Sequence, residues 1–297
     1  MQYLSDTELR QRAKDIYLNI FILTEDAKIG LLSLRDGAPY WAELFTHVLE
    51  EFNLRFGRYP TGFTNGFMKE VRIPDPRSPI AAKAAEVVTR RNLRSSNYLV
   101  KYGYSRHIRT ALERGAIRIS PASHYDDPSL NPAVRDHELK RSIQAHPSDI
   151  TIRVLDRRTM QPKEVKPIGN VTITQDSRTD YYVYCLSRCF APRLFLDFEY
   201  DACLIINQPP RFLSRLLNQF AQVKPNWGGT SLPVTYVDPL NTKERDLNVF
   251  CCKHFCHAYQ KEFRVIWLPP SPVGRLEHVD IQLGSLEDYC EIISISP

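Results

Sequence analysis

Short strands and helices follow one another in no regular order after residue 97, and this irregular order limits the possible folds most. Segments such as 181–187 and 202–206, rich in β-branched and aromatic residues, predict strands. Apolar residues at helical spacing within 210–223 predict a helix. A doubly wound sheet would need strands and helices in regular alternation. The pattern therefore predicts an α+β fold with a mixed, mainly antiparallel sheet.

The expected elements of this part of the chain can be placed by their residue patterns. Strands are predicted at 98–103, 116–120, 151–155, 171–174, 181–187, 202–206, 233–237, 263–268, 279–283 and 290–295. Helices are predicted at 105–112, within 210–223 and at 248–258. The polar insertion from His124 to about Ser148 predicts a loop with a possible helix.

The first 95 residues carry a helical pattern instead. A capping box, Ser5-Asp6-Thr7-Glu8, predicts the start of one helix, and a second is expected after Gly37. A Gly- and Pro-rich stretch at 56–79 follows, and the Ala-rich segment 80–88 predicts a further helix. We therefore expect two units: a helical N-terminal module over residues 1–95 and an α+β domain over residues 96–297.

Composition narrows the class of protein. The hydrophobic fraction of 43% and the charged fraction of 25% are ordinary for a globular chain. The longest apolar runs fall far short of the roughly 20 residues that a membrane-spanning helix needs. All seven cysteines lie between Cys185 and Cys290, an odd number that does not suit a secreted disulfide framework. We expect a cytoplasmic protein with reduced thiols and no membrane contact.

Basic residues concentrate between residues 90 and 118. Eight Arg or Lys residues stand there against one acidic residue, Glu113. Positive potential of this kind attracts phosphate groups or an acidic protein. A solvated helix face would give the same pattern, so the two interpretations stay open.

The segment Gln260-Lys261-Glu262-Phe263-Arg264 is the best candidate for chemistry. In a strand, Glu262 and Arg264 point to one face and Phe263 to the other. An acidic side chain at the mouth of a strand, beside Tyr259, can stabilise positive charge on a ligand. The alternative is an exposed Glu–Arg pair on an edge strand, which contributes little energy.

Cysteine and histidine residues also cluster at 251–257. Zinc sites usually combine one close pair of ligands with a second pair elsewhere in the chain. On the expected helix, however, Cys252 and Cys256 share one face and suit the core. We therefore expect no metal site.

From residue 98 onward, the order of short motifs resembles an uncharacterised bacterial domain family. That family has a Tyr-Lys-Tyr strand, an Arg-Phe-Ser-type strand, an Asn-Asp-Pro turn, a Cys-Phe-Ser strand and a late Glu-x-Arg strand. The corresponding segments here are Val100-Lys101-Tyr102, Ile117-Arg118-Ile119-Ser120, Asp126-Asp127-Pro128, Cys185-Leu186-Ser187 and Glu262-Phe263-Arg264. Val100, Asp126 and Leu186 depart from the family pattern.

That family is in turn similar to the ADP-ribosyltransferase superfamily, and the resemblance implies a domain of that type with NAD as its substrate. By this resemblance Glu262 is the catalytic acid and Gln260 contacts the acceptor. Tyr102 or Lys101 would hold the ribose or the phosphates of NAD, and Ser187 would brace the site. Arg118 is also assigned to NAD binding.

The resemblance further implies a toxin or phage-defence effector that transfers ADP-ribose to a macromolecular acceptor, protein or RNA, with a possible antitoxin or regulatory partner. It predicts that Tyr102, Ser187 and Glu262 line one cleft. The alternative function is a non-catalytic module that binds nucleic acid or protein through the basic 90–118 region.

Overall fold

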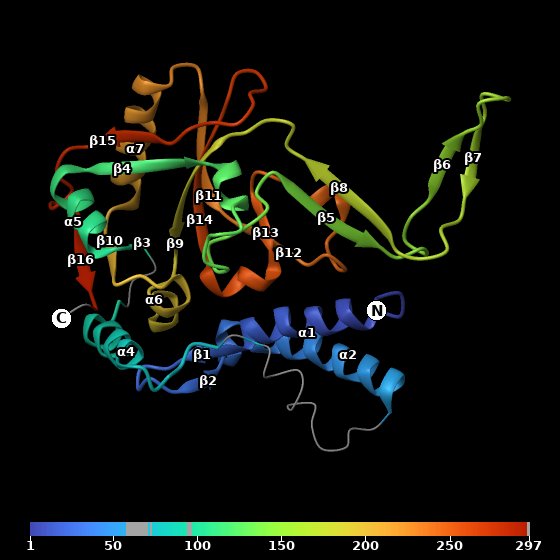
Figure 1. The fold of residues 1–297 in the computed structure, drawn as a ribbon, viewed down its shortest axis with the longest axis horizontal. Coiled ribbons are helices and arrows are strands. Elements are labelled where there is room, and N and C mark those ends of the chain that lie inside the picture. The colour runs from blue at the N-terminus through green and yellow to red at the C-terminus, as the bar shows by residue number, and fades with distance from the viewer. Residues whose placement is uncertain (58–70, 72, 94–96, 296–297) are drawn as a thin grey trace.

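The computed structural model describes residues 1–57, 71, 73–93 and 97–295. It has the predicted α+β architecture, built around an eight-stranded sheet whose strand pairs are all antiparallel (Figure 1). Six strands follow one another across this sheet in the order β11 (Gly228–Pro233), β14 (Glu262–Leu268), β9 (Tyr182–Ser187), β3 (Leu99–Gly103), β10 (Ala202–Ile206) and β16 (Cys290–Ser294).

The sheet forks at β9. Its Ser187 end pairs with Val100 of β3, whereas its Tyr182 end pairs with Pro121 of β4 (Ala116–Pro121). Helix α5 (Ser105–Arg114) connects β3 to β4, and β15 (Val279–Gln282) pairs with the outer edge of β4. Because two different strands share one edge of β9, they diverge and leave space between them.

Apolar side chains cover both faces of the sheet. On one face, Phe212 and Phe220 of α7 (Pro209–Val223) pack against β9 and β14, and Phe220 stacks on Trp267 with ring centroids 4.4 Å apart. On the other face, α4 (Pro79–Arg91) and α6 (Pro192–Phe198) cover Val100 and Tyr102. In β14, Val265 and Trp267 belong to the core on the α7 face, whereas Ile266 packs in a different cluster, so the predicted alternation is confirmed.

The N-terminal helices are α1 (Asp6–Ile20) and α2 (Ala38–Phe56), with the hairpin β1 (Phe21–Leu23) and β2 (Ile29–Leu31) between them. The capping box at Ser5 is confirmed. Arg12 forms a two-pronged ion pair with Asp238 at 2.6 and 2.8 Å, and Phe255 completes the core between α1 and α2. These helices thus dock on the α+β domain. The expected boundary at 95, Arg94 and most of the 56–79 stretch lie outside the described residues.

A long ribbon leaves the body on the other side. Strands β5 (Lys140–Ala145) and β8 (Val171–Asp176) pair with each other and lead to the hairpin β6 (Ile152–Leu155) and β7 (Pro162–Val165). Figure 1 shows this hairpin at the far right, away from the helices and the large sheet. The insertion predicted as a loop with a possible helix begins in a short 3-10 helix at Ala122–Asp126 and also contains strand β5, which the prediction did not include.

The predicted helix at 248–258 is wrong. The chain forms β13 (Cys252–His254), which pairs in parallel with β12 (Thr235–Val237), and then a 3-10 helix at Phe255–Gln260. Pairing with β12 outweighs the helical spacing of the apolar residues, so Cys252 and Cys256 do not share a helix face. All seven cysteines are free thiols. In the part of the chain that the structure describes, no three His, Cys, Asp or Glu side chains are grouped as metal ligands, and no helix is suited to cross a membrane.

Candidate functional site

A pocket of about 690 Å³ opens where the sheet forks, between β3, α5, β4 and β9. Six residues singled out from the sequence line this one pocket: Lys101, Tyr102, Arg118, Ser187, Gln260 and Glu262. The three that were expected to share a cleft, Tyr102, Ser187 and Glu262, are among them. The fold therefore brings these residues together, and their chemical roles stay predictions.

Neighbouring residues on β3 send their functional groups in different directions. The Tyr102 hydroxyl donates to the carbonyl of Cys189 at 2.9 Å and accepts from the backbone N–H of Ala191 at 3.1 Å. The Lys101 ammonium donates to the Cys185 carbonyl at 2.9 Å and lies 4.5 Å from the centroid of the Tyr184 ring. Burial lowers the pKa of Lys101. Lys101 and Tyr102 were both candidates for holding the ribose or the phosphates of NAD. Only Lys101 brings a cationic group, which lies beside the Tyr184 ring in the pocket.

Glu262 begins β14, which lies between β11 and β9, so the idea of a surface pair on an edge strand is wrong. The residue is 6% exposed. One carboxylate oxygen accepts from the Lys253 ammonium at 2.7 Å, and the other accepts from Nε of Arg264 at 2.5 Å. Burial alone would raise the pKa of Glu262, but Arg264 and Lys253 lower it well below its usual range. The carboxylate is therefore ionised at neutral pH.

Behind Glu262 lies a buried cluster of charged side chains, which we call the ion-pair cluster. Arg264 is fully buried and binds Glu138 through two bonds of 2.6 Å. The cluster holds three cations and three anions: Arg141, Lys253, Arg264, Asp136, Glu138 and Glu262. Buried charges are tolerated only when they are paired and hydrogen-bonded. This pairing fixes the side chain of Glu262 from behind, while Glu262 still lines the pocket.

Ser187 and Gln260 hold the turn that precedes β14. The Ser187 hydroxyl donates to the Gln260 carbonyl at 2.7 Å and accepts from the N–H of Cys189 at 2.9 Å. The Gln260 side chain accepts from Lys253 at 3.1 Å and donates to the Ala133 carbonyl at 2.8 Å. Lys261 completes the turn in a left-handed conformation, with φ 45°. The two residues thus set the position at which β14 and Glu262 begin.

The basic stretch is divided by the fold. Arg118 is exposed and binds Asp280 through bonds of 2.9 and 3.2 Å, and Arg91 binds Glu291 at 2.6 Å. Helix α5 presents Arg106, Arg109 and Arg114 to solvent. Apart from Arg90 on α4 and the paired Arg118, the exposed cations of this region among the described residues therefore lie on α5.

Sequence reasoning missed the aromatic and histidine lining of the pocket. Tyr104, Tyr184 and Tyr200 line it, together with His107 and His124. Tyr104 and His107 lie together at the start of α5, the other three come from separate segments, and no repeated spacing links them. Only their proximity to the predicted strand ends could have pointed to them.

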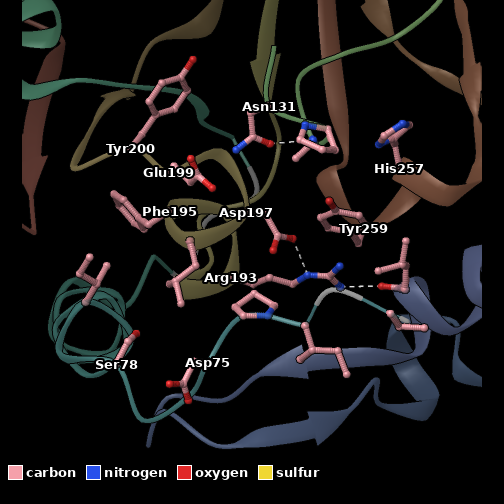
Figure 2. A pocket seen from close by; sticks show the side chains of 18 of the residues that line it. Asp75, Ser78, Asn131, Arg193, Phe195, Asp197, Glu199, Tyr200, His257 and Tyr259 are labelled. Atoms are coloured by element: carbon pink, nitrogen blue, oxygen red, sulfur yellow. Dashed lines mark hydrogen bonds and ion pairs between the residues drawn. The ribbon is translucent and has the colours of Figure 1, made fainter. Parts of the chain in front are cut away.

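A second pocket, of about 780 Å³, lies between α1, residues 71 and 73–80, and α6 (Figure 2). The Arg193 guanidinium stands between the rings of Phe21 and Tyr259, at 3.9 and 3.6 Å from their centroids. It donates to Asp197 at 2.8 Å and to the carbonyl of Leu18 at 2.6 Å. Arg193 thus links α6 to the end of α1. No local sequence pattern indicates this pocket, because its walls come from distant segments.

Known proteins offer no guide to this site. No family model, curated protein or solved structure matches the chain. The geometry of the pocket is therefore the basis for assigning its chemistry.

Proposed function

We propose that the pocket at the fork of the sheet binds NAD and that the chain is an ADP-ribosyltransferase-like enzyme acting on a macromolecule, protein or RNA. One observation carries the proposal: residues as distant as Lys101 and Glu262, chosen from short motifs, line the same pocket. Its volume of about 690 Å³ falls within the range of roughly 300–1,000 Å³ that is typical of cofactor sites.

The lining suits the parts of a dinucleotide. Aromatic walls such as Tyr104, Tyr184 and Tyr200 offer flat surfaces for the nicotinamide or adenine ring. Lys101 places a positive charge in the same pocket, where it can attract the diphosphate. Arg118 stands at an exposed position of the lining, already bound to Asp280.

The ionised carboxylate of Glu262 provides the group that the reaction needs. The bond between C1′ of the ribose and the nicotinamide nitrogen breaks, and its electron pair passes to the nicotinamide. Positive charge then develops on the ribose, and a fixed negative charge beside it lowers the barrier. A nucleophilic oxygen or nitrogen of the acceptor forms the new bond to C1′ and releases its proton.

Glu262 can do this although two cations already hold it. A carboxylate has about four lone-pair sites, and Lys253 and Arg264 each use one. The remaining sites can accept a hydrogen bond from a ribose hydroxyl. By the family resemblance, such a transferase would serve as a bacterial toxin or phage-defence effector, with an antitoxin or another regulator as its partner.

Transfer from labelled NAD tests the proposal. Wild type is incubated with cell extract, and label is followed separately in protein and in RNA. Glu262→Gln keeps the shape of the side chain but removes the charge, so we expect transfer to fall by about 10²–10³. Asp136→Asn is the matched control, because it removes a buried carboxylate from the same cluster but does not line the pocket.

Both variants need a check of folding, since Glu262 and Asp136 are buried. Circular dichroism and thermal unfolding supply it, and calorimetry measures NAD binding to each protein. Equal transfer by wild type and by folded Glu262→Gln would remove Glu262 from the mechanism. A wild type that neither binds NAD nor transfers label would contradict the proposal as a whole.

The arginine face of α5 supports a second candidate, the non-catalytic binding module. Three exposed arginines and one exposed acid, Glu113, lie on this ten-residue helix and give it a net positive charge. This candidate would be favoured if the wild type failed to bind NAD but bound nucleic acid or an acidic protein, with Arg106 and Arg109 required.

A further inference from the structure

Among the described residues, no strand of the body pairs with the β6–β7 hairpin, and most of its side chains are exposed. Its two strands form a separate two-stranded sheet and, among the described residues, pair only with each other. Figure 1 shows it extending beyond β5 and β8, at the end of the molecule. We call residues 152–168 the arm. An isolated two-stranded hairpin is marginally stable in water. The arm therefore gains little from its own fold and presents its side chains outward.

The arm is strongly basic. Five of its residues are cationic and two are acidic, a net charge of +3, whereas the whole chain carries +5. The cations are Arg153, Arg157, Arg158, Lys163 and Lys166. Within the described ranges, none of the five forms an ion pair, although Arg153 stands opposite Glu164 in the strand register. Their charge is thus available to an outside partner of negative charge.

Apolar side chains occur on both faces of the hairpin. The register pairs Ile152 with Val165 on one face, and Leu155 with Pro162 on the other. The chain also exposes Met160 at the turn, and Leu155 is 53% exposed. Binding to a groove on a protein would call for one continuous apolar stripe on one face. The arm has apolar groups on both faces and cations along its length, so it suits a partner with a groove that contacts both faces of the hairpin.

We propose that the arm binds double-stranded DNA by entering its major groove. That groove is about 12 Å wide and admits a two-stranded ribbon, whose strands lie about 4.8 Å apart. Phosphates along both groove walls then meet the cations, and apolar side chains meet the base edges. The narrow, deep major groove of duplex RNA excludes such a ribbon. A second copy of the arm is disfavoured as the partner, because the two arms would repel each other.

This proposal goes beyond the transferase reaction and does not rest on it, because no residue of the arm lines the NAD pocket. The two can therefore be tested separately. If both proposals are correct, one protein molecule binds DNA through its arm and NAD through its pocket.

The test measures the anisotropy of a labelled DNA duplex of about 20 base pairs at several salt concentrations, without NAD. Arg157 and Arg158 lie together in the turn of the arm, so Arg157→Ala/Arg158→Ala removes two cations without touching a strand. We expect this variant to bind about 10- to 100-fold more weakly near 0.1 M salt. The slope of log Kobs against log salt should become less steep by about 2, since each phosphate contact contributes roughly 0.9.

Arg10→Ala/Arg35→Ala is the matched control, because it removes the same charge from exposed side chains on α1 and just before α2, outside both the arm and α5. It should bind DNA as the wild type does. Equal weakening by both pairs of substitutions would show that net charge alone is responsible, and the proposal would fail. It would also fail if the wild type bound no duplex, bound duplex RNA as tightly as DNA, or bound only a protein.

Discussion

The ion-pair cluster and the arm are both rich in charge, but they use it in opposite ways. The six charged side chains of the cluster are 0–8% exposed, comprise three basic and three acidic residues, and bind one another. The arm exposes its five cations and has a net charge of +3. Charges that are paired inside the protein hold a side chain such as Glu262 in place. Charges that are exposed to solvent can instead attract a partner of opposite charge.

The difference also separates the expected effects of mutation. Removing one member of a buried pair leaves the other charge without compensation, which costs folding free energy. Removing an exposed charge alters what the surface attracts and leaves the fold almost unchanged. Stability measurements on single variants therefore test whether the charges of the ion-pair cluster and those of the arm differ in this way.

The largest effect is expected for Arg264→Met. Arg264 binds both Glu138 and Glu262, and its removal would leave two buried carboxylates without their main partner. Losing one member of a buried ion pair typically costs about 3–5 kcal/mol. We expect a decrease of that size in the free energy of unfolding, measured with urea and circular dichroism.

Arg118→Met provides the control for this measurement. Arg118 also binds a carboxylate in two-pronged fashion, but both partners are exposed. Exposed ion pairs contribute about 0–1 kcal/mol, so this variant should unfold nearly as the wild type does. If the two substitutions had equal effects, the cluster would not be the stabilising unit that its burial indicates.

A smaller effect, dependent on pH, is expected at His254, which lies beside the cluster. Burial lowers the pKa of His254 to about 4 in the folded chain, against an ordinary value of 6.5. As the pH falls through this interval, the unfolded state takes up a proton that the folded state does not. Unfolding therefore becomes easier, on the order of 2 kcal/mol by pH 5.

His254→Asn isolates this contribution. Asparagine can still accept from the backbone N–H of Cys256, as His254 does at 3.4 Å, but it does not titrate. The difference in unfolding free energy between wild type and variant should therefore shrink between pH 7 and pH 5. Glu138 and Asp15, whose pKa values burial raises to about 7 and about 6, titrate in both proteins and cancel. A constant difference across this range would show that His254 is not buried as a neutral group.

The sequence predicted the regular parts of the fold well. Strands such as β9 and β10 were found within one residue, because their alternation or continuous apolar run depends only on neighbouring residues. The helix expected at 248–258 failed because pairing of Cys252 with Thr235 is a long-range contact, which no local period reveals. Strand order is equally invisible, so β14 was considered as an edge strand although β11 covers it.

The candidate site was predictable only in part, for the same reason. Glu262 and Gln260 stand in a short local motif, and Ser187 follows a clear strand. Of the groups that hold Glu262, Lys253 comes from β13. Glu138, which binds the second cation Arg264, comes from the insertion that was predicted as a loop with a possible helix. Their role depends on burial, and burial of a charged side chain is decided by tertiary packing.

The smallest effect on stability is expected for Arg157→Ala/Arg158→Ala in the arm, the same substitution that should weaken DNA binding. Neither side chain has an ion-pair partner among the described residues, and both are exposed. The two guanidinium groups therefore stay hydrated in the folded state, and folding changes their free energy little. We expect the free energy of unfolding to change by less than about 0.5 kcal/mol in urea titrations without DNA. Added duplex should raise the apparent stability of the wild type more than that of the variant, since only a ligand of the folded state stabilises it. A decrease of more than about 1 kcal/mol in the free energy of unfolding without DNA would show that these arginines stabilise the fold, as the residues of the ion-pair cluster do. The contrast between the two regions would then be wrong.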